Sequence, residues 1–197
     1  MKRSKKSSKN KKFTVVVFYG VTAVGKYTVA KEFQKQTEYK FFHNHHAYDI
    51  ARSLFESGTI HISRLYENLS FTIFKEIANA KLNTATTQAF YADYVSETGL
   101  SDKNYMRKIE SIINRAGGTA YFVHLKANKE VLLKRVAGNS RKNFLKMNDP
   151  KALLRRLNNK KKDLITSAPV KNNLVIDNTK LSPKKVSDIV IKHFKIK

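Results

Sequence analysis

Short apolar runs alternate with helical spacings along most of this chain. Residues 13–19 (FTVVVFY) are apolar at consecutive positions, which is typical of a strand buried on both faces of a parallel sheet. Four more strands are predicted at 39–43, 88–94, 120–125 and 173–177. Helices are predicted between them, at 26–36, 47–55, 62–77, 105–116, and after Asn128, Asp149-Pro150 and Ser182-Pro183. This alternation predicts an α/β fold, a five-stranded parallel sheet with helices on both faces in three layers.

Length and composition narrow the class of protein. A chain of 197 residues can bury a sizeable core within one domain, which we expect to span residues 13–197. It contains no cysteine, so disulfides and thiolate zinc sites are excluded. Its apolar runs are far shorter than the roughly 18 residues that a membrane span needs. We therefore expect a cytoplasmic protein without a membrane span.

The charge of the chain is strongly positive and unevenly distributed. Lys and Arg number 39 against 15 Asp and Glu, a formal charge of +24. Residues 2–12 hold seven basic residues and no acid, which predicts a disordered basic tail over residues 1–12. A second basic segment, residues 141–162, holds nine basic residues and one acid. Such segments are compatible with a polyanionic partner, including nucleic acid.

A glycine-containing loop joins the first predicted strand to the first predicted helix. It reads GVTAVGKYT and has the spacing G-x-x-x-x-G-K. Glycines let backbone N–H groups turn toward an anion, the helix N-terminus adds its positive dipole end, and Lys26 would reach the outer phosphates. The residues expected to hold a nucleotide here are Gly20, Val21, Thr22, Ala23, Val24, Gly25, Lys26, Tyr27 and Thr28.

The position after Lys26 departs from the usual pattern. Tyr27 stands where Ser or Thr is common, and the hydroxyl comes one residue later at Thr28. Together with Phe42-His43-Asn44-His45 after the second strand, this loop resembles the P-loop kinases of the adenylate kinase and shikimate kinase group. The resemblance is closest to small kinase-like ATP-binding proteins with G-K-[LY]-T and F-H-N-H motifs. It implies a P-loop NTPase fold, ATP with Mg²⁺ as the bound nucleotide, a lid at about residues 138–162, and Thr28 on magnesium, through water, or on phosphate.

Polar residues that would bind an acceptor follow the second and third predicted strands. Ligands of such sheets bind beyond the carboxyl ends of the strands. The residues expected to bind the acceptor are His43, Asn44, His45 and Arg52. The base that takes the acceptor's proton is left open between His43, Asp49 and Asp93, and Asp93 is also a candidate for magnesium.

Arginines in the second half of the chain complete the expected site. Arg135 and Arg141 resemble the lid arginines of the related kinases, which contact adenine and the transferring phosphates. Guanidinium groups suit both tasks. Arg155 or Arg156 could replace Arg141, since one of them should face inward. Asn178 and Thr179, after the last strand, are expected beside the adenine by the same resemblance.

These features predict an ATP-dependent phosphotransferase that acts on a small-molecule or nucleotide acceptor. No apolar strand is followed by the Asp-Glu pair that aligns water in mechanical ATPases, which favours transfer over hydrolysis. The alternative is a nucleic-acid-binding protein, or a polynucleotide kinase, that uses the basic tail and the basic lid.

Overall fold

The computed structural model describes residues 12–138, 149–159 and 161–196. The strands are β1 (Thr14–Gly20), β2 (Lys40–His43), β3 (Thr84–Ala89), β4 (Thr119–Lys126) and β5 (Asn173–Asp177). The helices are α1 (Lys26–Gln36), α2 (His45–Leu54), α3 (Ile60–Asn79), α4 (Asp102–Arg115), α5 (Lys129–Val136), α6 (Pro150–Asn159), the short 3-10 helix η2 (Lys161–Leu164) and α7 (Pro183–Phe194). The predicted tail lies almost wholly, and the predicted lid partly, outside the described residues.

The predicted α/β fold is confirmed, with one element misplaced. The third strand was expected at 88–94, but β3 spans Thr84–Ala89 and overlaps that range only at its start. Its sequence, TATTQA, is polar, yet all but its last residue is buried. Buried polar side chains need hydrogen-bond partners, and Thr87 and Gln88 have theirs on neighbouring elements. The more apolar stretch that follows β3 belongs to a loop.

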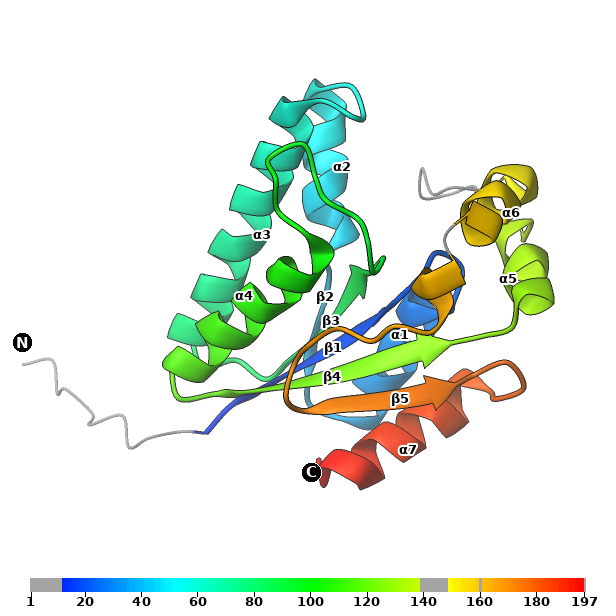
Figure 1. The fold of residues 1–197 in the computed structure, drawn as a ribbon. Coiled ribbons are helices and arrows are strands. Elements are labelled where there is room, and N and C mark those ends of the chain that lie inside the picture. The colour runs from blue at the N-terminus through cyan, green and yellow to red at the C-terminus, as the bar shows by residue number, and fades with distance from the viewer. Residues whose placement is uncertain (1–11, 139–148, 160, 197) are drawn as a thin grey trace, which may run out of the picture.

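All five strands are parallel, in the order β2-β3-β1-β4-β5. Helices α3 and α4 cover one face of this sheet, and α1 and α7 cover the other (Figure 1). The alternating side chains of β1 serve both layers: Val16 and Phe18 pack with α1 and α7, whereas Val15 and Val17 pack with α3 and α4. This burial on both faces explains why β1 has no polar alternation.

Side-chain caps fix the starts of three predicted helices. Asn128 Oδ1 accepts a hydrogen bond from the Val131 N–H at 2.9 Å, at the start of α5. Ser182 caps α7, with Pro183 at its first position. Asp149 accepts from the backbone N–H of the second residue of α6 at 2.8 Å. Each cap satisfies a helical donor that would otherwise lack a partner, typically contributing about 1 kcal/mol.

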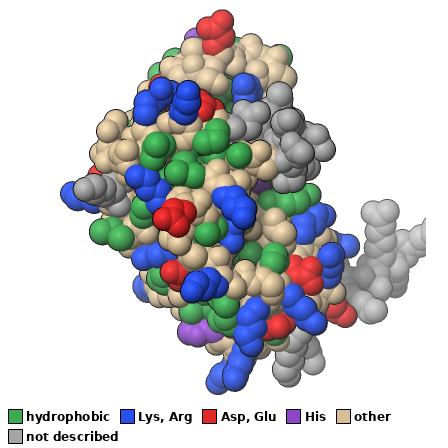
Figure 2. Space-filling model, turned by 90° about the vertical axis from the view of Figure 1, so that its right-hand side faces the viewer, with side chains coloured by type: hydrophobic (Ala, Val, Ile, Leu, Met, Phe, Trp, Pro, Cys, Tyr) green, Lys and Arg blue, Asp and Glu red, His purple; other side chains and the backbone are tan. Residues whose placement is uncertain are grey.

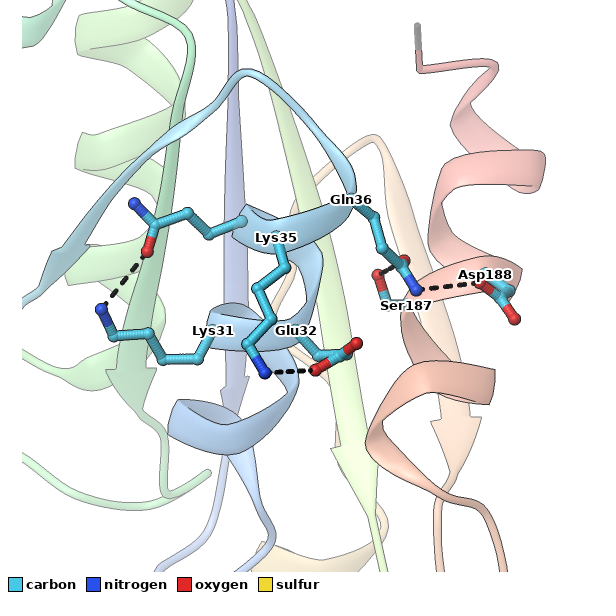
Figure 3. A network of polar contacts seen from close by, with 7 residues as sticks. Lys31, Glu32, Lys35, Gln36, Ser187 and Asp188 are labelled. Atoms are coloured by element: carbon cyan, nitrogen blue, oxygen red, sulfur yellow. Dashed lines mark hydrogen bonds and ion pairs between the residues drawn. The ribbon is translucent and has the colours of Figure 1, made fainter.

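Polar contacts tie the end of α1 to α7 (Figure 3). The Gln36 side-chain amide donates to Asp188 Oδ1 at 3.2 Å, and its carbonyl oxygen accepts from the Ser187 hydroxyl. Ser187 is fully buried. Because the other end of α1 begins at the glycine loop, these contacts help to hold that loop relative to the sheet. No helix in the described part of the chain has both the length and the apolar character needed to cross a bilayer.

A buried histidine makes the stability of this core depend on pH. His124 in β4 stacks on Tyr19, with ring centroids 4.6 Å apart, and its Nδ1 lies 2.9 Å from the Ser167 hydroxyl. Burial lowers the pKa of His124 from 6.5 to about 4, and the nearby Lys126 and Lys26 charges add to this. The unfolded chain therefore binds the proton more readily, and the free energy of unfolding falls as the pH drops from the unfolded value to the folded one.

We expect this histidine to destabilise the fold by about 2 kcal/mol between pH 7.5 and pH 5. Urea unfolding of the wild type and of His124→Gln at both pH values measures the effect. The comparison cancels every other titrating group, so the wild type should lose more stability than the variant. Equal losses in the two proteins would show that His124 titrates normally.

Candidate functional site

A cleft of about 1080 Å³ opens at the carboxyl ends of β1, β2 and β3. One end is formed by the glycine loop and the first turn of α1, and the other by residues of α2, α3, α4 and α6. This is where ligands of parallel α/β sheets are expected. The cleft has room for a ligand larger than a single small metabolite, since ordinary ligand pockets span about 300–1,000 Å³.

The glycine loop wraps around its own lysine. Lys26 Nζ donates to the carbonyl oxygens of Gly20 at 2.9 Å and Val21 at 2.7 Å. Gly20, Ala23 and Gly25 have positive φ, at 136°, 65° and 99°. Gly25 precedes α1 without a side-chain cap, and the first turn of that helix has no acidic residue. The positive end of the α1 dipole therefore faces the cleft with nothing from its own first turn to neutralise it.

Not every residue of the predicted loop faces the cleft. The described lining includes Thr22, Ala23, Gly25, Lys26, Tyr27 and Thr28. Val21 and Val24 are instead buried in the core, where they anchor the loop. Thr22 is held by the Tyr91 hydroxyl, which lies 2.6 Å from Thr22 Oγ1. The same hydroxyl accepts a hydrogen bond from the Thr22 backbone N–H at 3.3 Å.

Arg135, in α5, and Asn178, directly after β5, brace the glycine loop. Asn178 Nδ2 donates to the Val24 carbonyl at 2.8 Å. Arg135 donates to Val24, to Asn178 Oδ1 at 3.2 Å and to the Asn178 carbonyl at 3.1 Å. Both residues line the cleft. Thr179 does not: its hydroxyl accepts from the Asn128 N–H, and its own N–H donates to Asp177, so it shapes a turn.

His43, at the end of β2, and His45, at the start of α2, both line the cleft. His43 is buried, contacts the Thr87 hydroxyl through Nδ1, and meets the Tyr27 ring edge-on at 5.0 Å. His45 lines the cleft and lies 3.4 Å from Asp49. Tyr27, where a small hydroxyl residue was expected, thus forms part of the wall toward β2.

Arg52 also reaches the cleft from α2, whereas Asp49 is not among its lining residues. Asp49 Oδ1 lies 3.4 Å from His45 Nε2, so its described contact is with His45.

A buried polar network fixes the wall behind these residues. Asn44 Nδ2 donates to Gln88 Oε1 at 2.6 Å and to the hydroxyls of Tyr66 and Tyr105, both at 3.0 Å. Asn44 Oδ1 accepts from Ser70 at 3.0 Å. The network joins α2, β3, α3 and α4, so a single buried amide sets the relative position of four elements.

Asp93 does not reach the cleft, contrary to the expectation. It was placed at the end of the third strand, but β3 ends at Ala89, and Asp93 lies in the loop beyond it. Its side chain is about half exposed and lies 3.9 Å from Lys103 Nζ. The role of base or magnesium ligand at a strand end is therefore withdrawn for Asp93.

Asp102 takes the place in the cleft that Asp93 was expected to fill. It lies in the first turn of α4, and its Oδ2 accepts from the Tyr91 N–H at 2.8 Å. Burial raises the pKa of Asp102 from 3.8 to about 7, against the Tyr91 N–H and the Arg156 charge, which lower it. One feature of the sequence points to this residue: Ser101-Asp102 is a helix start that follows a loop rich in aromatic and polar residues.

Of the two adjacent arginines in α6, Arg156 faces the cleft. Its guanidinium carbon lies 3.5 Å from the Tyr91 ring centroid, and none of the described residues accepts a hydrogen bond from its Nε, which is buried. Arg155 points to solvent and is exposed. Arg141 lies outside the described residues, whereas Arg156, the predicted alternative to it, lines the described cleft.

The described residues contain no group of three or more His, Asp or Glu side chains arranged to hold a metal ion. Thr28 lines the cleft beside Lys26 and offers the hydroxyl expected there.

The basic residues of the described surface do not gather into one patch on the side formed by α5, α6 and α7. Figure 2 shows Lys and Arg side chains spread over this face with acidic and apolar ones between them. The basic tail and residues 141–148 lie outside the described residues. This face therefore shows no continuous basic surface, and nucleic-acid binding stays a prediction.

Comparison with solved structures agrees with this architecture. A sugar kinase from a Janibacter species is 17% identical, with a TM-score of 0.63 over 94% of this chain and 95% of that one. A putative kinase from Chloroflexus aurantiacus is 15% identical, with a TM-score of 0.67 over 93% and 99%. Shikimate kinase from Acinetobacter baumannii, solved with shikimate, is 14% identical, with a TM-score of 0.60 over 93% of each chain.

Comparison of the sequence, unlike comparison of the structure, found no match. No protein-family model and no curated protein matches the sequence. At such low identity a structural likeness speaks for the architecture alone. The chain therefore shares the fold of these sugar and shikimate kinases.

Proposed function

We propose that this protein transfers the γ-phosphoryl group of ATP-Mg²⁺ to a hydroxyl group of a small molecule. One observation carries the proposal: a single cleft joins the Lys26 loop to a second wall of cationic, aromatic and carboxylate side chains. A nucleotide and an acceptor could share that space, which a transfer reaction requires. The sugar and shikimate kinases with the same fold support a small-molecule acceptor.

The nucleotide would occupy the end of the cleft nearest α1. Backbone N–H groups of residues 22–28 would bind its phosphates, and Lys26 would exchange its two loop carbonyls for phosphate oxygens. Arg135 and Asn178, braced on Val24, would lie beside the base and the phosphates. Magnesium, when bound with the nucleotide, would supply charge neutralisation on the phosphates, with Thr28 as the nearest protein hydroxyl.

The acceptor would occupy the other end. Arg52 and Arg156 offer donors and positive charge there, His45 adds an imidazole ring, and the tyrosines around them offer apolar contact. The buried Nε of Arg156, to which no described residue provides an acceptor, needs an oxygen partner. A transferring phosphoryl group or an anionic acceptor would provide one, because guanidinium groups bind such oxygens in pairs.

Nucleotide binding is the first property to test. With ATP-Mg²⁺ at about 100 times its Kd, the free energy of unfolding should rise by about 2.7 kcal/mol. For a chain of this size that corresponds to a Tm increase of about 5–10 °C. Thermal unfolding with ATP, GTP and CTP, each with and without Mg²⁺, measures this shift, and AMP serves as a control without outer phosphates. If no nucleoside triphosphate raises Tm, the proposal is wrong.

Transfer is tested next, with [γ-³²P]ATP and a panel of sugars, polyols, hydroxy acids and nucleosides. Label that appears in one acceptor, and exceeds the phosphate released to water, would support a kinase. Label that appears only in phosphate would point to an ATPase.

A further inference from the structure

We propose that Asp102 is the catalytic base that accepts the proton of the attacking hydroxyl. This inference rests on the proposed function, since it concerns the same cleft. It names a residue in the first turn of α4 that is not among the three bases the sequence left open, His43, Asp49 and Asp93. Asp102 is distinguished by the position of its carboxylate, by the charges around it, and by the contacts that occupy the other acids near the cleft.

The Asp102 carboxylate is fixed relative to the phosphate-binding loop through one residue. Tyr91 donates its backbone N–H to Asp102 Oδ2 at 2.8 Å, and its hydroxyl is hydrogen-bonded to Thr22. The Tyr91 ring is covered by Arg156 at 3.5 Å. A carboxylate held in this way would stay at a fixed distance from the outer phosphates of a bound nucleotide. Fixed geometry of this kind is what positions a base for an incoming hydroxyl.

The other acids near the cleft have different tasks. Glu67 also lines it, but its carboxylate accepts from the Ser96 hydroxyl at 2.7 Å and from the Thr98 hydroxyl at 2.8 Å. Asp49 is next to His45 outside the lining, and Asp93 is beside Lys103 at the surface. Among the described carboxylates, Asp102 is therefore the one that lines the cleft without being tied to side chains of the 96–98 loop.

The surroundings of Asp102 tune it for proton transfer near neutral pH. Burial raises its pKa to about 7, the Tyr91 N–H and the Arg156 charge lower it, and the Asp163 charge in η2 raises it. The phenols of Tyr66 in α3, Tyr94 in the loop after β3 and Tyr105 in α4 are close enough for the Asp102 charge to raise their pKa values. Those phenols stay neutral, so Arg156 and Asp163 are the charged groups that face the carboxylate. Asp102 is thus protonated below about pH 7 and able to accept a proton above it.

Phosphoryl transfer replaces one bond at the γ-phosphorus by another. The acceptor oxygen forms a bond to the γ-phosphorus, and the bond from that phosphorus to the β,γ-bridging oxygen breaks, with its electron pair leaving on ADP. The acceptor's O–H proton moves to an oxygen of Asp102. The neutral carboxylic acid later releases this proton to water.

The test compares wild type with Asp102→Asn, using ATP-Mg²⁺ alone and water in place of the acceptor. Asparagine keeps an oxygen that can accept from the Tyr91 N–H, so the fold should survive. The wild-type rate of phosphate release should rise with pH through an inflection near 7, the value expected for Asp102. In Asp102→Asn the rate at pH 8 should fall by about 100-fold and the inflection should vanish. Calorimetry should give a Kd for ATP-Mg²⁺ within about twofold of wild type, because the outer phosphates bind elsewhere.

A matched control is Glu130→Gln, an exposed carboxylate in the first turn of α5. It should leave the rate, its pH profile and the Kd unchanged. The Tm of Asp102→Asn at pH 8 should be no lower than that of wild type, since the substitution removes a charge that burial disfavours. These readouts separate a lost base from a damaged fold.

Each remaining outcome decides the question. If Asp102→Asn binds ATP-Mg²⁺ and keeps the wild-type rate and inflection, Asp102 is not the base, and the proposed function stands. If the wild type binds ATP-Mg²⁺ but releases no phosphate at any pH, the role is also overturned, because a base at this position would activate water. If the wild type does not bind ATP-Mg²⁺, the proposed function fails and this inference fails with it.

Discussion

Lys26→Ala should weaken ATP-Mg²⁺ binding by about 10- to 100-fold. The substitution removes the one side-chain cation that projects from the loop itself, and a hydrogen bond to a charged group contributes about 1.5–3 kcal/mol. Turnover should fall further, because the lysine charge would also follow the phosphoryl group as it moves. Calorimetry with ATP-Mg²⁺ and the phosphate-release assay measure the two effects. An unchanged Kd would contradict both the predicted role of Lys26 and the proposed function.

A control must account for the second role of Lys26. Its ammonium group also donates to the carbonyl oxygens of Gly20 and Val21, so the variant loses contacts that shape the empty loop. Lys31→Ala removes a lysine from the same helix, but Lys31 bonds to Gln34 at the surface (Figure 3). Lys31→Ala should leave the Kd unchanged, and unfolding of all three proteins without nucleotide shows how much of the loss is structural.

The sequence correctly predicted the elements whose apolar residues are buried in the core. The helix at 26–36 and the strand at 173–177 have the bounds expected of them, and the caps at Asn128 and Ser182 are where the pattern placed them. In these elements local propensity, turn chemistry and burial agree, which is the condition under which sequence patterns are informative.

The third strand was misplaced because its interior is polar. Thr86, Thr87 and Gln88 are buried, and hydrophobicity alone cannot distinguish such residues from a loop. They are polar because β3 borders the cleft: Thr87 contacts His43, and Gln88 joins the network of Asn44. The error therefore coincides with the site, as expected where function overrides the local pattern.

For the candidate site too, the sequence predicted some of the lining residues and missed others. The glycine loop has a spacing that physics explains, and Lys26, Thr28, Arg135 and Asn178 all line the cleft. Asp102 belongs to no motif. Its importance comes from the fold of the loop before α4, which brings the Tyr91 N–H to its carboxylate across 11 positions of sequence. Contacts of this kind depend on the whole loop, so no spacing rule could have selected Asp102 over Asp93.

Gly20→Ala should be the most destabilising single substitution in the phosphate-binding loop. Gly20 has φ of +136°, and a Cβ there would lie 2.5 Å from the carbonyl oxygen of Leu125 in β4. That atom belongs to the backbone of a central strand paired with β1, so it cannot move aside as a flexible side chain could. Backbone strain of about 1–3 kcal/mol and overpacking of about 1–3 kcal/mol together predict a loss of about 3 kcal/mol or more.

Urea unfolding of Gly20→Ala against Gly117→Ala separates the two contributions. Gly117 also has positive φ, at 79°, but a Cβ there would meet nothing within 4 Å, so its substitution should lose only the strain contribution of about 1 kcal/mol. The excess loss in Gly20→Ala then measures the contact with β4. Because the Gly20 carbonyl also accepts from Lys26, this variant should lose nucleotide binding at temperatures where it is still folded, whereas Gly117→Ala should keep it. Equal loss of stability in the two variants would mean that β1 and β4 can separate at this point at little cost, and that the loop is not held by the sheet as tightly as its contacts imply.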